Sequence, residues 1–332
     1  MNIFVSMPCN ERYATFLTPK AMKRLESLGN VRRNPYDRVL TTDEIIEMAQ
    51  DADVIMTSWS TCKYSKAVIE KLPNLKMIAH AGGTVKLVVE PDAYETNVEI
   101  ISGNDVFAKS VAEGALSYTL AALRRLEHFG GLMRTGGWSE PNFYNRGLFG
   151  KTVGIVGFGS IAKHFVNMIR YFDCEVLIYS SHLSNEEAAK YNARVASLEE
   201  IFSECDIISI HASRTPKTEK MVSRELMERM KPDALLVNTA RASVTDEDAL
   251  FELLMAGRFN AALDVMNEEP FPADHPLRKC KNVLLMPHMG GPTIDMREVV
   301  TLELCKDIAR LQNGEELMNR ITAEAAARMT SS

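Results

Sequence analysis

The chain alternates short apolar runs with stretches in which apolar residues recur at helical spacing. Such runs are typical of strands buried in a parallel sheet, and a period of three to four residues is typical of helices that cover it. In the first part of the chain, this pattern predicts strands at 2–6, 54–57, 77–79 and 99–102, and helices at 19–28, 42–50 and 63–71. A long helix rich in Ala and Leu follows at 111–129. These elements predict an α/β domain.

The same alternation resumes after a segment that is rich in Gly and polar residues. It predicts strands at 153–156, 175–179, 207–210, 234–238, 261–265 and 283–286, and helices at 185–191, 198–203, 223–230, 246–256 and 296–312. Strands that alternate with helices build a doubly wound parallel sheet, in which ligands bind beyond the carboxyl ends of the strands. We therefore expect an α/β fold with a Rossmann-type nucleotide domain and a second α/β domain. Functional residues should follow the strands.

One junction between a strand and a helix has the sequence of a phosphate-binding turn. The predicted strand at 153–156 is followed by Gly157 and Gly159, and a helical pattern begins at Ser160 and Ile161, with Ala162 in the third position of the motif. Glycines allow backbone N–H groups to approach a pyrophosphate, and the helix N-terminus adds partial positive charge. A purely structural turn is the alternative. The position between strand and helix favours a dinucleotide.

Composition narrows the class of protein. A chain of 332 residues exceeds one ordinary core, so two domains are expected. The net charge of −6 and the lack of a dense Lys/Arg block in the sequence argue against nucleic acid as a partner. Neither an apolar run long enough for a membrane span nor a signal peptide is found. The 6 Cys are scattered without a Cys-x-x-Cys pair, which favours reduced thiols in a cytoplasmic protein and no metal site.

Three predicted strand ends carry groups suited to hydride transfer to a ketone. Arg241 offers a planar fork of donors that matches a carboxylate. His288 is the natural proton donor near neutral pH, and Glu269 against its other ring nitrogen would orient the imidazole. Each alone has a structural alternative: a surface ion pair, a core histidine or a solvated turn. Together, about one βα step apart, they predict a catalytic group.

With these residues, the chain resembles the D-isomer-specific 2-hydroxyacid dehydrogenase family. The matching segments are 153–162, 230–241, 246–250, 262–265, Glu269-Pro270 and Pro287-His288 with Gly290-Gly291. The resemblance implies that Arg241 binds the substrate carboxylate and carbonyl, that His288 is the acid/base and that Glu269 orients it. It also implies a flavodoxin-like substrate domain made of residues 1–102 and 292–332, around a dinucleotide domain at 103–291.

The resemblance implies further binding residues. Backbone amides of Ala81, Gly82 and Gly83 would hold the substrate carboxylate, and Asp264 with the backbone of Ala240 would hold the nicotinamide carboxamide. Residues expected to contact the cofactor lie at the glycine turn and the strand ends: Gly157, Gly159, Ser160, Ile161, Ser180, Ser181, His182, His211, Thr215, Thr239, Ala240, Arg241, Asp264, His288 and Gly290. The cofactor is expected to be NAD or NADP.

The choice between NAD and NADP stays open on the sequence. NAD-dependent members usually carry an acid after the second nucleotide-binding strand, but this chain has Ser180-Ser181-His182 there. No carboxylate would repel a 2′-phosphate, and the two hydroxyls and the histidine could receive one. Arg214 could supply positive charge.

The loop expected to hold the substrate, residues 79–86, departs from the usual sequence of the family. His80 and Lys86 in this loop either line the site or face solvent. Ser58-Trp59-Ser60 lacks the basic residue expected for a phosphorylated substrate. A small, non-phosphorylated 2-oxo or 2-hydroxy acid, such as glyoxylate or hydroxypyruvate, is therefore expected.

A homodimer is expected for two reasons. Leu116, Leu120, Leu123 and Phe129 cannot all face one core, although a helix buried between two domains would look similar. Trp138 also resembles a family tryptophan that reaches the partner's site. Two rival activities remain: a corepressor-like dinucleotide sensor, whose relatives carry long disordered tails, and a formate-oxidising enzyme, whose relatives have Gln in place of Glu269.

Overall fold

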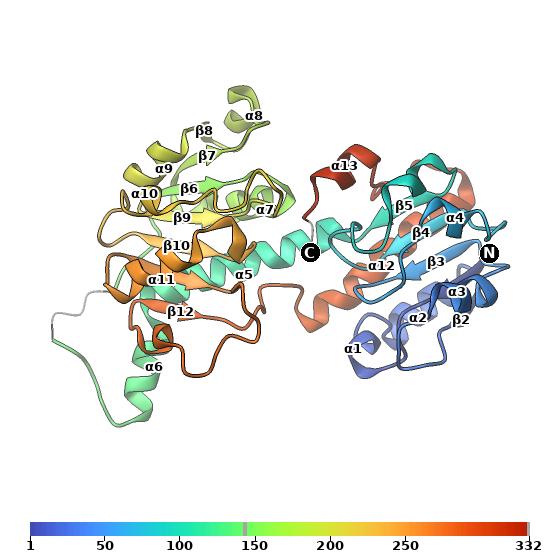
Figure 1. Cartoon of the computed structure of the whole chain (residues 1–332), viewed down its shortest axis with the longest axis horizontal. Coiled ribbons are helices and arrows are strands. Elements are labelled where there is room, and N and C mark those ends of the chain that lie inside the picture. The colour runs from blue at the N-terminus through green and yellow to red at the C-terminus, as the bar shows by residue number, and fades with distance from the viewer. Residues whose placement is uncertain (142–144, 331–332) are drawn as a thin grey trace. The chain divides into compact units, whose positions relative to one another are not determined.

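The computed structural model describes residues 1–141 and 145–330. It divides into two compact units, residues 1–108 with 292–332, and residues 109–291. The first boundary between the units, after residue 108, lies inside helix α5 (Asn104–Arg124), whereas the boundary expected from the sequence lies between residues 102 and 103. Each unit is built around a parallel sheet (Figure 1).

The sheet of the first unit has the strand order β2-β1-β3-β4-β5. Its strands are β1 (Asn2–Val5), β2 (Asn30–Arg33), β3 (Val54–Thr57), β4 (Met77–His80) and β5 (Glu99–Ser102). All neighbours pair in parallel, which is the flavodoxin-like order. Alternate residues enter different cores: Met56 packs on one face and Ile55 on the other. The predicted second α/β domain is confirmed.

The sheet of the second unit has the order β12-β11-β10-β9-β6-β7-β8. Its strands are β6 (Thr152–Val156), β7 (Glu175–Tyr179), β8 (Ala193–Val195), β9 (Ile207–Ile210), β10 (Leu235–Asn238), β11 (Asn260–Leu263) and β12 (Val283–Leu285). The order reverses beside β6, as in a Rossmann sheet. Leu236 and Val237 enter cores on opposite faces. The predicted doubly wound sheet is therefore confirmed.

One predicted helix is divided in two. The pattern at 111–129 suggested a single helix, but α5 begins at Asn104 and ends at Arg124, and Arg125 has a left-handed φ of 50° before α6 (Leu126–Arg134). The other α-helices are α1 (Glu11–Ala14), α2 (Pro19–Glu26), α3 (Thr42–Met48), α4 (Lys66–Ile69), α7 (Ser160–Ile169), α8 (Asn185–Ala189), α9 (Leu198–Glu204), α10 (Arg224–Met227), α11 (Glu247–Met255), α12 (Ile294–Asn313) and α13 (Ala323–Arg328). Short 3₁₀ helices lie at Pro91–Glu95, Arg170–Phe172, Ala242–Val244 and Pro276–Lys279.

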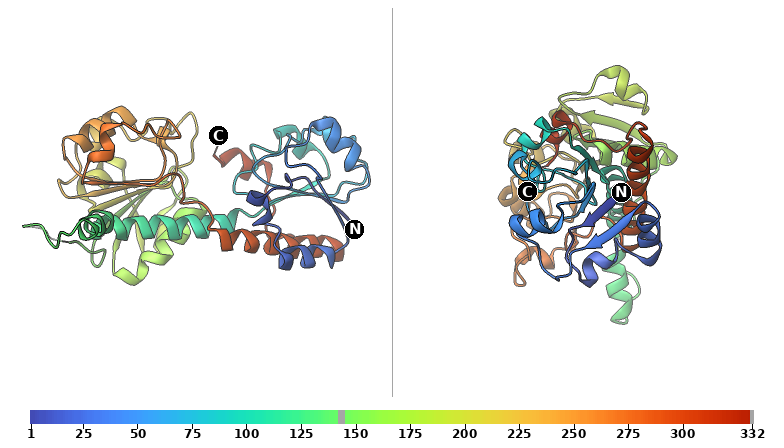
Figure 2. Two further views of the ribbon diagram at one scale, coloured as in Figure 1. Left: turned by 90° about the horizontal axis from the view of Figure 1, so that it is seen from below. Right: turned by 90° about the vertical axis from the view of Figure 1, so that its right-hand side faces the viewer.

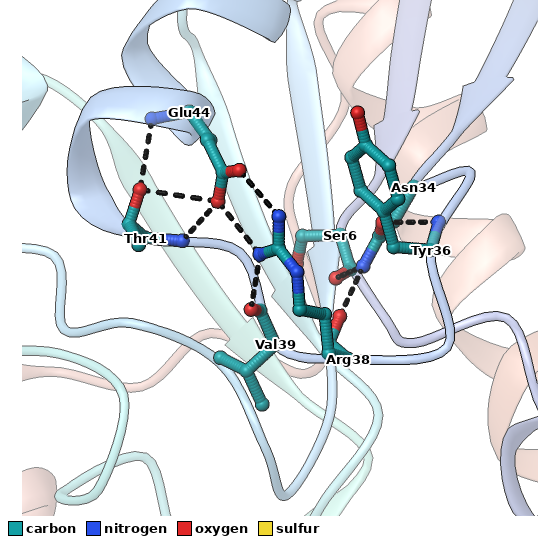
Figure 3. Close-up of polar contacts among 7 residues, drawn as sticks. All are labelled: Ser6, Asn34, Tyr36, Arg38, Val39, Thr41 and Glu44. Carbon is teal, nitrogen blue, oxygen red and sulfur yellow. Dashed lines mark hydrogen bonds and ion pairs between the residues drawn. The ribbon is translucent and has the colours of Figure 1, made fainter.

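The start of α3 is fixed by a capping box that includes an arginine (Figure 3). The Glu44 carboxylate accepts from the Thr41 amide at 2.8 Å, and Arg38 donates to both of its oxygens at 2.6 and 2.9 Å. The hydrogen bond from Arg38, followed by the one from the Thr41 amide, lowers the pKa of Glu44 to about 2. Asn34 holds the preceding loop, because its side-chain amide donates to the carbonyls of Ser6 and Arg38.

The C-terminal segment belongs to the first unit. Helix α12 lies beside α2 (Figure 2), and its residues Val300 and Leu304 are fully buried in the core under β1 and β3. The buried Asp307 accepts hydrogen bonds from the amides of Met318 and Asn319, which fixes the chain after α12. In the described ranges, no helix is both long enough and apolar enough to cross a membrane.

Candidate active site

The glycine turn after β6 forms a cradle at the start of α7. Gly157 has φ of +92°, and a Cβ there would lie 2.7 Å from backbone atoms of Ala212, so only glycine fits. Gly159 precedes the helix without a side-chain cap, and a Cβ at this position would meet nothing within 4 Å. The first turn of α7 begins directly after this open glycine, where anions bind at a helix N-terminus. This geometry fits the pyrophosphate of a dinucleotide.

The other predicted cofactor and catalytic residues follow parallel strands of the same sheet (Figure 1). Ser180, Ser181 and His182 follow β7, His211 and Thr215 follow β9, Thr239, Ala240 and Arg241 follow β10, Asp264 follows β11, and His288 and Gly290 follow β12. Because the strands are parallel, their carboxyl ends meet at one edge of the sheet. The structure thus brings these residues to the same side as the glycine turn.

His288 and Glu269 form a hydrogen-bonded pair at this edge. The imidazole Nδ1 lies 2.8 Å from Glu269 Oε2, while Glu269 Oε1 accepts from the Met266 amide at 3.1 Å. Partial burial works to raise the pKa of Glu269, but hydrogen bonds from His288 and Met266 outweigh it and lower the pKa. The carboxylate is therefore ionised and orients the ring. His288 Nε2 has no hydrogen-bond partner among the described residues, so it is available to a substrate.

Asp264 fixes the turn that carries His288. Its two carboxylate oxygens accept from the amides of Met289 and Gly290, each at 2.8 Å, and its carbonyl accepts from the His288 amide at 2.9 Å. His288 itself has a left-handed φ of 53°. Burial raises the pKa of Asp264, and the two amides partly offset this rise. The sequence suggested that Asp264 contacts the nicotinamide, but it did not reveal this positioning contact.

Arg241 lies on a turn braced by Asn238. The Asn238 side chain accepts from the Ala240 amide at 3.0 Å and donates to the Arg241 carbonyl at 3.1 Å. Arg241 Nη1 donates to the Ala240 carbonyl at 2.6 Å, and the guanidinium forms no ion pair with an acid within residues 1–141 and 145–330. Burial lowers the pKa of Arg241, and the charge of Glu269 opposes this. A half-buried cation without an acidic partner is suited to an anionic ligand.

Two buried polar atoms at the strand ends lack a hydrogen-bond partner among the described residues. His211 contacts Ser209 Oγ through Nε2 at 2.9 Å, but residues 1–141 and 145–330 offer no partner to its Nδ1 or to Thr239 Oγ1. Burial lowers the pKa of His211 to about 3, so the ring is neutral. Unsatisfied buried groups of this kind suit a polar ligand. By contrast, Thr215 contacts Thr218 through its amide and its hydroxyl, which stabilises its own turn.

The segment after β7 carries no carboxylate. Ser181 and His182 are exposed and Ser180 is half-buried. Arg214, the sequence candidate for contacting a 2′-phosphate, lies 3.8 Å from Glu219 and forms an ion pair with it. Its charge is thus partly neutralised within the protein.

The predicted substrate loop lies in the first unit, after β4. All three carbonyls of Ala81, Gly82 and Gly83 accept from serine hydroxyls, the first from Ser58 at 2.9 Å and the others from Ser102 at 2.8 and 3.0 Å. The Ala81 amide donates to Thr57 at 2.8 Å. The amides of Gly82 and Gly83 have no acceptor in the part of the chain that the structure describes. Of the three predicted amides, these two are available to a carboxylate.

His80 is buried beneath this loop rather than exposed to solvent. Its Nδ1 lies 3.0 Å from Thr57 Oγ1, and a Cβ on Gly82 would lie 2.1 Å from its Nε2. Burial lowers the pKa of His80 to about 4, and a hydrogen bond to the Thr84 backbone only partly offsets this. Lys86 is half-buried.

Comparison with known proteins places this geometry in a family. Residues 116–290 match the model described as D-isomer specific 2-hydroxyacid dehydrogenase, NAD binding domain. The chain belongs to this family. The matched residues include the glycine turn and the strand ends just described. The cofactor class predicted from the sequence, a nicotinamide dinucleotide (NAD or NADP), is confirmed by this match.

Individual relatives differ in their substrates. The chain is 33% identical over 297 residues to D-3-phosphoglycerate dehydrogenase of Methanocaldococcus jannaschii, covering 89% of this chain but only 56% of that protein. It is 32% identical over 280 residues to glyoxylate reductase of Thermococcus litoralis, covering 82% of this chain and 84% of the relative. The fold matches that of D-lactate dehydrogenase with NAD⁺ from Lactobacillus jensenii, with a TM-score of 0.80, 22% identity, and coverage of 97% of this chain and 100% of that one.

Proposed function

We propose that this protein reduces a small 2-oxo acid to the D-2-hydroxy acid with NADH or NADPH. The observation that carries the proposal is the pair of His288 and Glu269, 2.8 Å apart, at the strand ends that also hold Arg241 and the glycine turn. Acids of the glyoxylate and hydroxypyruvate type are the first substrates to test. The reduced nicotinamide, when bound, supplies a hydride to the carbonyl carbon.

Each residue of this group has a chemical role in the proposal. His288 Nε2 donates a proton to the carbonyl oxygen as negative charge develops there. Glu269 accepts from Nδ1, so the ring presents its other nitrogen to the substrate and the imidazolium is stabilised. Arg241 binds the substrate carboxylate and polarises the carbonyl through its planar fork. In this proposal, residues 1–102 with 292–332 form the substrate domain, whose loop amides at Gly82 and Gly83 bind a carboxylate, and residues 103–291 form the dinucleotide domain.

A panel of 2-oxo acids assayed with NADH and with NADPH tests the reaction. In His288→Ala, kcat should fall roughly 100-fold or more, because general acid catalysis usually contributes that much to the rate. The dinucleotide should still bind. Glu269→Gln should lower kcat in the same direction. Glu268→Gln is the matched control, because this neighbouring acid is exposed. Near-normal turnover in His288→Ala would overturn the assignment, and dinucleotide binding without turnover of any acid would favour the corepressor-like sensor.

We also propose a homodimer formed through the second unit. Leu116, Leu120 and Leu123 pack on the core of the sheet, so they do not form the patch expected from the sequence. Large apolar side chains are instead exposed around α6 and the segment that follows it: Leu126, Met133, Trp138 and Phe149. A groove of about 540 Å³ lies between α6 and β12. Exposed apolar patches of this kind mark protein contacts.

Light scattering behind a sizing column tests the dimer. A mass near the 37.1 kDa of one chain at micromolar concentration would reject it. The double variant Leu126→Ser with Met133→Ser should shift the population toward monomer, whereas Met318→Ser, on an exposed apolar residue of the first unit, should not.

We also propose a cytoplasmic location. The 6 cysteines are all free thiols, which supports a reducing compartment.

A further inference from the structure

Two arginines from distant segments lie against the same tryptophan in the first unit. The guanidinium carbon of Arg12, on α1, lies 5.0 Å from the ring centroid of Trp59, and that of Arg297, on α12, lies 5.2 Å from it. Trp59 is half-buried just beyond the end of β3. Cations within about 6 Å of an indole are attracted to its ring. Both guanidinium groups therefore lie against the same ring.

Neither arginine is neutralised by an acid in the parts of the chain that the structure describes. Other arginines of the first unit form ion pairs with acids. Arg38 pairs with Glu44, and Arg320 pairs with Glu99. Within the described ranges, neither Arg12 nor Arg297 has an acidic partner. Arg297 Nη1 donates to Thr15 Oγ1 at 3.3 Å, but its Nε is buried without an acceptor. Burial, and then the charge of Arg12, lowers the pKa of Arg297.

Arg297 is half-buried and Arg12 is exposed, so neither cation is shielded from a dissolved anion. A partly buried charge needs a partner to offset its lost hydration, and like charges at one ring repel each other. The buried and unsatisfied Nε of Arg297 shows that its hydrogen-bonding capacity is incomplete. A ligand carboxylate or phosphate would supply the missing counter-ion, because its oxygens match a guanidinium fork.

The cluster adjoins the loop with the free amides. The Trp59 ring packs edge-on against Phe16 at 5.2 Å and Phe107 at 5.9 Å. Phe107 in turn lies 3.9 Å from where a Cβ on Gly83 would be. Ser58, the residue before Trp59, donates to the carbonyl of the same loop at Ala81. The arginines and the loop amides are therefore linked by one continuous set of packed side chains in the first unit.

We propose that Arg12, Trp59 and Arg297 form a distal anion subsite, and that the preferred substrate is a 2-oxo acid with a second anionic group on its side chain. This inference rests on the proposed reaction. The second group is a carboxylate or a phosphate, since both match a pair of guanidinium forks. The expectation of a non-phosphorylated substrate considered only residues 58–60, whereas the positive charge comes from residues 12 and 297.

Paired substrates test the subsite in the intact protein. Hydroxypyruvate is compared with 3-phosphohydroxypyruvate, and pyruvate with oxaloacetate and 2-oxoglutarate. In Arg297→Met and Arg12→Met, kcat/KM for the dianionic acids should fall about ten- to a hundredfold, mainly through KM, because a hydrogen-bonded charge partner is lost. The values for pyruvate and hydroxypyruvate should stay the same. Arg297→Lys should recover part of the loss, and whichever dianionic series responds more identifies carboxylate or phosphate.

Arg24→Met is the matched control, because Arg24 is an exposed arginine of the same unit that contacts Ser27. The subsite is overturned if the unaltered protein shows no preference for a dianionic acid, or if Arg297→Met affects both series equally or behaves like Arg24→Met.

A binding experiment separates failure of the subsite from failure of the proposed reaction. The chain has 2 Trp, so Trp138→Phe leaves Trp59 as the single tryptophan. In this background, 2-oxoglutarate or 3-phosphoglycerate should alter Trp59 fluorescence at lower concentration than acetate does, and Arg297→Met should remove the difference. If no 2-oxo acid is turned over but this difference is found, the reaction fails and the subsite stands. Equal responses to all three anions would overturn the subsite.

Discussion

The backbone amide of Gly290 donates to Asp264 Oδ2 over 2.8 Å, and a Cβ on residue 290 would lie 2.6 Å from that oxygen. The same carboxylate accepts from Met289, so it holds both residues after His288. A left-handed backbone costs a non-glycine residue about 1–2 kcal/mol, and His288 has φ of 53°. The bonds to Asp264 offset that cost. Asp264 is therefore a positioning residue for the histidine that faces Glu269.

Asp264→Asn should weaken catalysis through this turn. An amide group can accept from one of the two backbone amides but not from both, so the other is left unsatisfied in a buried place, at about 1–3 kcal/mol of stability. We expect kcat to fall roughly ten- to a hundredfold, because small displacements of a catalytic group have effects of that size. Steady-state kinetics, thermal unfolding and dinucleotide titration together check this. The exposed Asp274→Asn serves as control, and an unchanged kcat in Asp264→Asn would contradict the role.

Arg241→Lys should separate charge from geometry. Lysine keeps the positive charge but loses the planar fork that matches a carboxylate. KM for 2-oxo acids should rise about tenfold or more, in line with the loss of a charge-assisted hydrogen bond, and the dissociation constant of the dinucleotide should stay the same. Arg258→Lys is the matched control, because this arginine donates to the Glu228 carbonyl on an exposed surface. An unchanged KM would argue against substrate binding by Arg241.

The sequence predicts those features that depend on residues close together in the chain. Apolar runs located the buried strands. The sequence suggested Arg241, Glu269 and His288 because each comes after a predicted strand, and the structure places Glu269 and His288 within hydrogen-bond distance. The edge strands β2 and β8 were missed, since their residues are partly exposed and include several polar ones, as in Asn-Val-Arg-Arg. The break at Arg125 was missed as well. Neither Gly nor Pro marks it, and it depends on a left-handed backbone that the pattern does not encode.

Contacts between distant segments could not be predicted from the sequence. His80 is buried because β3 and β4 pair in register, which places Thr57 opposite it. Arg12 and Arg297 meet at Trp59 because α1 and α12 pack on the same unit. Asp264 reaches the amides after His288 because β11 and β12 are neighbours. Each of these relationships is set by strand order and helix packing, which spacing along the chain does not reveal.

Ser180→Asp should change the cofactor preference. A carboxylate at this position, just after β7, would accept hydrogen bonds from the adenosine ribose hydroxyls and repel a 2′-phosphate. We expect kcat/KM with NADH to rise relative to NADPH by about tenfold, the effect of roughly 1.4 kcal/mol. The exposed Ser181→Asp is the adjacent comparison. If the NADH/NADPH ratio in Ser180→Asp equals that of the parent, Ser180 does not face the ribose.

Acid should destabilise the protein through its buried histidines. Burial lowers the pKa of His80 to about 4, against 6.5 for an ordinary histidine. Between these values the unfolded chain binds a proton that the folded chain excludes, so the free energy of unfolding decreases as pH falls from 6.5 toward 4. At about 1.4 kcal/mol per pKa unit, His80 alone accounts for a loss of about 3 kcal/mol at pH 4. His211 acts in the same direction, since burial lowers its pKa to about 3.

His80→Gln tests this contribution. Urea unfolding at a series of pH values should show that the variant is less stable than the parent at pH 7 but loses about 3 kcal/mol less between pH 7 and pH 4. Thr57→Val is the control, because it removes the hydroxyl beside Nδ1 and keeps the buried imidazole. Its stability should be lower at every pH with a slope close to that of the parent. Parallel curves for His80→Gln and the parent would mean that His80 does not exclude a proton in the folded state.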